Sequence, residues 1–190
     1  MKFRDSGMPN EQIWNTFFDP RSILRQMEVT ANIKTLIDIG CGYGTFLIPA
    51  SEIIAGHIVG VDIESEMIGV CAQKINEYDI KNAELICGDI STEVTLRSLD
   101  KCKGNADYIT LFNILHCEQP QELLKNAYNL LNINGKVGVI HWIYGETPRG
   151  PALEVRPIPE TIIDWAEKAG FVLTKKVDLP PYHFGLIFKK

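Results

Sequence analysis

Short apolar runs rich in β-branched residues recur along the chain and predict the strands of one sheet. Five runs precede residue 143 and two follow residue 170, at 34–39, 57–61, 83–87, 106–111, 136–142, 171–177 and 182–189. The first five are almost continuously apolar, which is typical of strands covered on both faces. We therefore expect a sheet that lies between two layers of helices.

Segments with helical periodicity lie between these runs. One segment places Ile68, Cys71 and Ile75 on a single face, and another covers residues 123–131 after Pro120, a residue favoured in the first turn of a helix. The alternation of strands and helices predicts an α/β protein with a doubly wound, mostly parallel sheet and right-handed crossovers.

The last third of the chain has a different pattern. Pro159 starts a helical segment that Gly170 ends, as a glycine just after a helix commonly does. The two runs that follow are separated by residues 178–181 alone, the sequence DLPP. Because so short a connection joins antiparallel strands, these runs predict a hairpin.

Residues 1–33 precede the first strand, and we expect them to form an N-terminal helical cover over the sheet's working edge. Asn10 and Asp19 are expected N-caps, and Pro20 is expected to start the second helix. The first helix is expected to carry four large apolar residues on one face: Ile13, Trp14, Phe17 and Phe18. Residues 34–190 are expected to form one domain.

Charge and cysteine content narrow the classes of partner. The chain has 19 Lys and Arg against 24 Asp and Glu, for a net charge of −5, and no basic cluster. We therefore expect neither a nucleic acid nor a membrane as partner. Five scattered cysteines form no C-x-x-C pair, so we expect a reduced, cytoplasmic protein without a metal site.

Three glycines alternate with other residues directly after the first predicted strand. Gly40, Gly42 and Gly44 carry no Cβ, so a ligand can lie against the main chain there. In open parallel sheets, ligands bind beyond the carboxyl ends of the strands, where this turn falls. Pro49 indicates that a helix begins just before it, because proline is tolerated mainly in the first turn.

Acidic residues at the ends of three successive strands indicate which ligand binds. Asp38 precedes a G-x-G-x-G turn rather than the G-x-G-x-x-G of dinucleotide sites, and its carboxylate favours an ammonium group over a pyrophosphate. Asp62 is placed for ribose hydroxyls, and Asp89 for the amine of adenine. Asp62 and Asp89 could instead cap helices. Together they predict S-adenosylmethionine.

Five motifs, DIGCGYG, VGVDIES, CGDIS, DYITLFNILHC and LLNINGKVGVIHW, make residues 34–190 resemble the class I S-adenosylmethionine-dependent methyltransferases that act on small molecules. The resemblance implies a Rossmann-like, seven-stranded sheet of order 3-2-1-4-5-7-6 with the last strand antiparallel, and S-adenosylhomocysteine as product. It also implies a set of cofactor-binding residues: Asp38, Gly40, Cys41, Gly42 and Gly44 for methionine, Asp62 for ribose, Ile63, Met67, Asp89 and Ile90 for adenine, and Asn113 and Leu115 near the sulfonium.

Methyl transfer from a sulfonium is an in-line displacement, so the protein contributes mainly alignment and exclusion of water. A general base is needed only where the acceptor holds its proton at neutral pH. The expected catalytic residues are His116, His141 and Tyr144, and the expected acceptor-binding residues are Trp14, Phe18, Trp142, Arg149 and Arg156. The two arginines could bind a carboxylate or phosphate of an anionic acceptor, although surface arginines are common.

Two other functions remain open on the sequence. The chain could be a non-catalytic S-adenosylmethionine-binding subunit that activates a partner, or, less favoured because of Asp38, an NAD-dependent oxidoreductase. A monomer or a homodimer is expected in either case.

Overall fold

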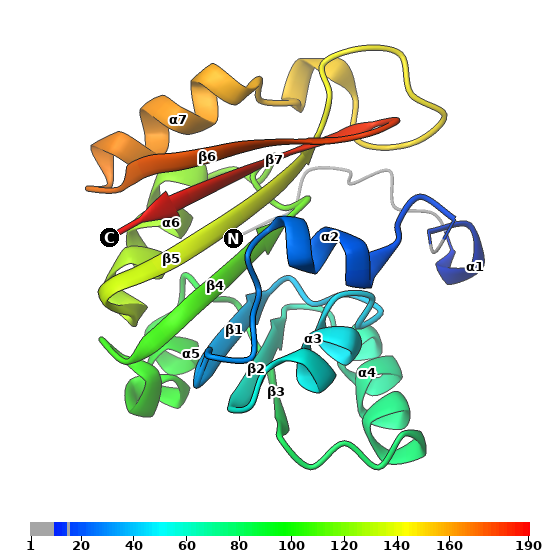
Figure 1. The fold of residues 1–190 in the computed structure, drawn as a ribbon, viewed down its shortest axis with the longest axis vertical. Coiled ribbons are helices and arrows are strands. Elements are labelled where there is room, and N and C mark those ends of the chain that lie inside the picture. The colour runs from blue at the N-terminus through cyan, green and yellow to red at the C-terminus, as the bar shows by residue number, and fades with distance from the viewer. Residues whose placement is uncertain (1–9, 15) are drawn as a thin grey trace.

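The computed structural model describes residues 10–14 and 16–190. Its centre is a seven-stranded sheet of order β3-β2-β1-β4-β5-β7-β6, which confirms the expected order (Figure 1). Strands β1 to β5 pair in parallel, and β7 runs antiparallel to both β5 and β6. The strands are β1 (Thr35–Ile39), β2 (His57–Asp62), β3 (Ala83–Cys87), β4 (Ala106–Phe112), β5 (Leu131–Trp142), β6 (Val172–Leu179) and β7 (His183–Lys189).

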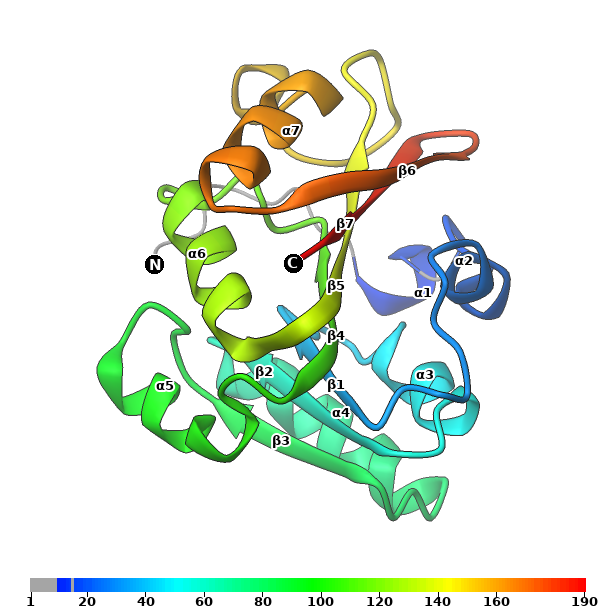
Figure 2. The same cartoon turned by 60° about the vertical axis from the view of Figure 1, so that its left-hand side comes forward.

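Helices cover both faces of the sheet. Figure 2 shows α5, α6 and α7 on one side and α2 and α3 on the other. Each face has its own apolar core, with Leu124 and Ile162 on the first side and Leu24 and Leu47 on the second. The helices are α1 (Glu11–Trp14), α2 (Pro20–Gln26), α3 (Leu47–Ile53), α4 (Ser65–Glu77), α5 (Glu93–Ser98), α6 (Pro120–Leu130) and α7 (Pro159–Lys168).

The largest difference from the expected strand boundaries is in β5, which begins at Leu131 rather than Lys136. Turn-forming residues such as Asn134 and Gly135 indicate a turn, so the sequence did not predict this extension of the strand. The strand nevertheless continues through them, because Leu131 pairs with Ala106 across a register shift in β4.

The first helix is shorter than expected, and its predicted apolar face is wrong. Helix α1 ends at Trp14, which is buried, whereas Ile13 is 37% exposed. Phe17 and Phe18 follow the helix instead of sharing its face. The two expected caps are present: the side chain of Asn10 accepts from the backbone N–H of Ile13, and Asp19 accepts from Ser22. Residues 1–9 of the expected cover lie outside the described residues.

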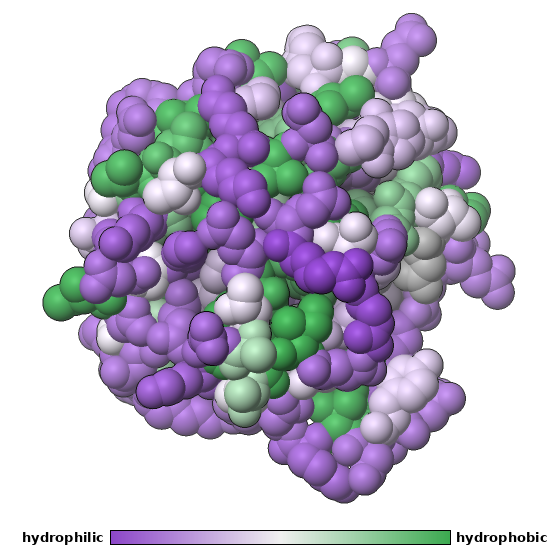
Figure 3. Space-filling view, viewed as in Figure 1, coloured by the Kyte–Doolittle hydropathy of each residue, from purple (hydrophilic) through white to green (hydrophobic). Residues whose placement is uncertain are grey.

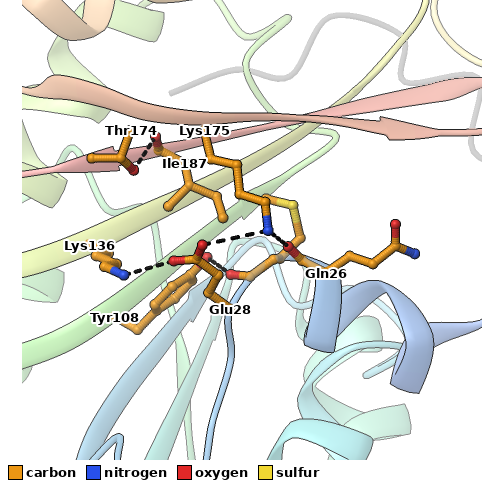
Figure 4. A network of polar contacts seen from close by, with 8 residues as sticks. Gln26, Glu28, Tyr108, Lys136, Thr174, Lys175 and Ile187 are labelled. Carbon is orange, nitrogen blue, oxygen red and sulfur yellow. Dashed lines mark hydrogen bonds and ion pairs between the residues drawn. The ribbon is translucent and has the colours of Figure 1, made fainter.

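A polar network fixes the end of α2 to the sheet (Figure 4). Glu28 accepts from Lys136 Nζ of β5 at 2.7 Å and pairs with Lys175 Nζ of β6 at 3.5 Å. The buried hydroxyl of Tyr108 in β4 donates to the carbonyl of Met27. Bonds to three strands therefore hold the chain that leads from α2 to β1.

We expect Tyr108→Phe to lower the free energy of unfolding by about 1–3 kcal/mol, because the buried Met27 carbonyl loses its donor. Urea denaturation measures this change. Tyr78→Phe is the matched control, since Tyr78 is 60% exposed. Equal effects of the two substitutions would show that the Tyr108 bond contributes nothing.

The surface on the side seen in Figure 1 is mostly hydrophilic, with hydrophobic residues exposed in separate small areas (Figure 3). Across residues 10–14 and 16–190, no helix combines the length and apolar character needed to cross a bilayer.

Candidate functional site

The glycine turn leaves β1 and leads into α3. Gly40 has φ +79°, and a Cβ there would lie 2.6 Å from Cγ2 of Ile114, so only glycine fits without displacing that side chain. The N–H of Gly40 donates to the carbonyl of Val61 in β2 at 2.7 Å. The Cys71 thiol donates to the carbonyl of Gly42 at 3.1 Å. Helix α3 begins at Leu47 and has Pro49 in its first turn, as expected.

Asp38 places a buried carboxylate beside this turn. It is 4% exposed, and Thr110 Oγ1 donates to its Oδ1 at 2.5 Å. Burial raises the pKa of Asp38 to about 6, the Thr110 hydrogen bond opposes that rise, and the charge of Asp62 adds to it. Among the described residues, no Lys or Arg lowers this pKa. A ligand ammonium at this position would therefore supply a counter-charge that the protein itself does not.

Asp62 and Asp89 hold the loops that follow β2 and β3. Asp62 Oδ2 accepts from the N–H of Gly42 at 2.8 Å, and its Oδ1 accepts from Glu64 at 3.0 Å. Asp89 Oδ1 accepts from the N–H of Ser91 at 2.8 Å. Neither acid is a helix N-cap, because α4 is preceded by Glu64 and α5 by Thr92. The alternative that these acids cap helices is thus wrong, and both stand in turns.

Most of the expected cofactor-binding residues line two adjoining hollows. The main cavity, of about 290 Å³, lies between the glycine turn and the end of β4. A smaller one of about 20 Å³ shares Gly40, Asp62 and Ile114 with it. Of the expected residues, the main cavity is lined by Trp14, Asp38, Gly40, Cys41, Gly42, Asp62, Met67, Asn113, His116 and Trp142, and the smaller one by Gly40, Asp62, Ile63, Asp89 and Ile90.

Seven of the expected residues line neither hollow: Gly44, Leu115, Phe18, His141, Tyr144, Arg149 and Arg156. Gly44 supports the turn, where a Cβ would lie 3.0 Å from Cys71 Sγ. Leu115 is completely buried in the core that packs α6 and α7 on the sheet. Phe18 lies behind the main cavity, with its ring centroid 4.9 Å from Trp14 and 5.3 Å from Phe46.

Asn113 follows β4 directly and lines the main cavity. Both its backbone conformation and the hydrogen bonding of its side chain are unusual. Its backbone has φ +58°, a left-handed conformation that asparagine tolerates better than most residues. It is 8% exposed, and both amide atoms lack a hydrogen-bond partner within the described part of the chain. Buried polar atoms are rarely left without partners, and backbone strain concentrates at functional sites. Asn113 is therefore suited to a ligand that both donates and accepts.

The expected catalytic residues are not equivalent. His116 lines the main cavity, and His141 packs against it with ring centroids 5.6 Å apart. His141 is fully buried, and burial, followed by the charge of His116, lowers its pKa to about 3. His141 is therefore neutral at pH 7 and lies outside the cavity lining. Tyr144 is 60% exposed and also lies outside that lining.

The structure corrects the expectation that Arg156 binds an anionic acceptor. Its guanidinium is buried and donates to the carbonyls of Pro151, Ile143, Gly145 and Arg149. A loop rich in proline and glycine leaves such carbonyls without secondary-structure partners, and Arg156 pairs with them. Arg149 lies with Arg156 along a separate surface hollow formed by the same loop.

Several lining residues were missed by the sequence analysis: Tyr43, Thr45, Phe46, Glu64, Phe112 and Ile114. Each lies within a few positions of an expected site residue in the chain. This closeness in sequence was the signal that could have identified them. Phe112 and Phe46 touch edge to face at 4.8 Å, although 66 positions separate them in the chain. Within the described residues, no group of three or more His, Cys, Asp or Glu is placed to hold a metal ion.

Comparison with known proteins identifies the family of the chain. The family model described as a methyltransferase domain matches residues 37–137. A demethylmenaquinone methyltransferase from Oceanobacillus iheyensis is 25% identical over 120 residues, which cover 62% of this chain and 48% of that protein. The chain spans about half the length of the curated relatives it matches.

Solved structures share the fold. A SAM-dependent methyltransferase from Aquifex aeolicus superposes with a TM-score of 0.82 at 21% identity, covering 95% of this chain and 93% of that one. Geranyl diphosphate C-methyltransferase from Streptomyces coelicolor, in complex with S-adenosyl-L-homocysteine, gives a TM-score of 0.71 at 15% identity, covering 89% and 76%. Since the family model spans more than half of the chain and the sheet has the class I strand order, the chain belongs to the methyltransferase domain family, in its S-adenosylmethionine-dependent class I.

Proposed function

We propose that the protein transfers a methyl group from S-adenosylmethionine to a small-molecule acceptor by in-line displacement. The observation that carries this proposal is the buried Asp38 carboxylate beside a glycine turn, with no Lys or Arg in the described chain to lower its pKa. A carboxylate in that position matches the ammonium of an amino acid and would repel a pyrophosphate. The names of the relatives support small-molecule acceptors, since one refers to demethylmenaquinone and another to geranyl diphosphate.

The lining residues fit the parts of this cofactor. Asp38 would hold the ammonium, and Asp62 would accept from the ribose, since each of its carboxylate oxygens has capacity beyond its one backbone bond. Ile63, Asp89 and Ile90 in the smaller hollow would hold adenine, with Met67 at its face. Asn113 would stand beside the sulfonium. These residues bind and orient the donor, and the buried side chains around it exclude water.

Calorimetric titration tests the cofactor directly. We expect S-adenosylmethionine and S-adenosylhomocysteine to bind and NAD to give no heat. Binding of NAD alone would favour an oxidoreductase, and binding of none of the three would overturn the proposal. Incubation with labelled methyl donor and a metabolite extract then separates an enzyme from a non-catalytic binding subunit, which would bind the donor yet form no labelled product.

We propose His116 as the general base for an acceptor that holds its proton, because it is the histidine that lines the main cavity. We expect His116→Ala to lower kcat by about 100-fold or more and to leave the Kd for S-adenosylhomocysteine within about twofold. His57→Ala is the control, since His57 starts β2 at the opposite end of the strand from Asp62. An unchanged kcat in the His116 variant would exclude it as the base.

A further inference from the structure

We propose, on the basis of the function proposed above, that the methyl acceptor is a compact, uncharged aromatic ring that carries a hydroxyl group. Four aromatic side chains of the main cavity, here called the aromatic wall, would hold it: Trp14, Phe46, Phe112 and Trp142. Four features of the cavity support this assignment: its aromatic lining, its charge, its size and its unsatisfied amide.

The aromatic wall is built from four separate elements. Trp14 ends α1, Phe46 precedes α3, Phe112 ends β4 and Trp142 ends β5. Each is at most 9% exposed, and ring contacts join them in pairs, at 4.8 Å for Phe46 and Phe112 and 6.5 Å for Trp14 and Trp142. Phe18 connects the pairs from behind. Because the rings support one another, they present a firm apolar surface that a flat ring can stack against.

The charge of the cavity excludes an ionised acceptor. Among the described residues, its lining includes the acidic residues Asp38, Asp62 and Glu64 and neither Lys nor Arg. A carboxylate or phosphate on the acceptor would therefore find no cationic side chain in this lining to pair with, and burying a charge without such a partner is unfavourable. A cation would meet the sulfonium of the donor at close range, where like charges repel. An uncharged acceptor avoids both costs.

The size of the cavity favours a small acceptor. Its volume of about 290 Å³ is at the lower end of the range for small-molecule sites, roughly 300–1,000 Å³. The methionine end of the donor takes part of this space. What remains within the cavity suits a single ring.

The side-chain amide of Asn113 is the reason to expect a hydroxyl group on the acceptor. Its Nδ2 and Oδ1 are buried without hydrogen-bond partners in the described residues, and the residue lines the cavity between Phe112 and Ile114. A hydroxyl both donates and accepts, so it can pair with the amide atom that faces it whichever way the oxygen and nitrogen are assigned. The same hydroxyl would lie in the cavity that His116 lines, where a base could take its proton.

The test compares two ligands that share a ring and a hydroxyl and differ in charge. Protein saturated with S-adenosylhomocysteine is titrated calorimetrically with catechol and, separately, with salicylate. We expect catechol to bind and salicylate to bind at least about tenfold more weakly. We expect Trp14→Leu to weaken catechol binding about fivefold or more, whereas Trp165→Leu, which lies outside the main cavity, leaves it unchanged.

The affinity for S-adenosylhomocysteine reports whether each variant is folded. Should Trp14→Leu lose that affinity, Phe46→Leu takes its place in the comparison. Salicylate binding as tightly as catechol, no catechol binding to the loaded protein, or equal effects at Trp14 and Trp165 would overturn this inference. Each of these results leaves the proposed function standing, whereas failure of S-adenosylhomocysteine to bind the unmodified protein overturns that function instead.

Discussion

Asp38→Asn is expected to weaken the binding of S-adenosylhomocysteine by about 100-fold. The amide keeps the shape of the carboxylate but removes the charge that faces the ligand ammonium, and removing one partner of a buried charge pair typically costs about 2–5 kcal/mol. Calorimetry measures the change. Asp178→Asn in β6 is the control, because Asp178 is exposed and outside both hollows. A change below about threefold would show that Asp38 does not bind the ammonium.

The same substitution is expected to stabilise the ligand-free protein at pH 7.5, by an amount on the order of 1–3 kcal/mol. Burial raises the pKa of Asp38 from 3.8 to about 6 in the folded protein. Between these pH values the folded state keeps a proton that the unfolded state has released, so the free energy of unfolding falls as pH rises through this window. Asparagine has no such proton. Urea denaturation at pH 7.5 and pH 4 should show the gain at the higher pH alone.

The affinity for the ligand should also depend on the titration of Asp38, but in the opposite direction. Stability falls as the pH rises, whereas affinity falls as the pH is lowered. Below pH 6 a growing fraction of Asp38 is protonated and cannot pair with an ammonium, so the Kd of the wild-type protein for S-adenosylhomocysteine should rise about tenfold per pH unit. The Asp38→Asn variant should lack this dependence. A flat profile for the wild-type protein would contradict the assigned role.

Gly40→Ala is expected to lower both stability and cofactor affinity more than any other single substitution in the glycine turn. The left-handed backbone costs an alanine roughly 1–2 kcal/mol. In addition, its Cβ would lie 2.6 Å from Cγ2 of Ile114, a branched position that cannot move without turning the whole side chain. We expect a total loss of about 3 kcal/mol or more in urea denaturation. We expect the Kd for S-adenosylhomocysteine to rise by about 100-fold, because the methyl group would alter the turn that approaches the ligand.

Gly104→Ala is the matched control for this substitution. Gly104 has φ +71°, close to the +79° of Gly40, but a Cβ there meets nothing within 4 Å. The Gly104→Ala variant should lose only the stability that a left-handed backbone costs an alanine, and it should keep its affinity for S-adenosylhomocysteine. Equal losses at the two positions would show that the contact with Ile114 and the approach of the ligand are unimportant.

The sequence by itself predicted the sheet and most of the residues that line the proposed cofactor end of the site. All seven strands were predicted from the sequence: the inner strands because a strand buried on both faces is apolar along its length, and the mostly exposed edge strand β6 because only a short connection separates it from β7. Gly40 and Asp38 could be predicted because the turn requires a residue without a Cβ and the proposed ligand would require a carboxylate, and each requirement falls on one residue at a strand end. Such features are local, so one stretch of sequence contains them.

Only the tertiary structure decided which residues come together at the proposed acceptor end. The aromatic wall unites Trp14 with Phe46, Phe112 and Trp142 from four elements, and nothing in the spacing of these residues shows that they meet. Arg156 was expected to bind the methyl acceptor. It instead donates hydrogen bonds to loop carbonyls, because buried backbone groups must be paired. His116 lines the cavity and His141 packs behind it, a difference set by the packing of β4 against β5. Contacts between distant segments depend on how the elements pack, and single-sequence patterns do not encode that packing.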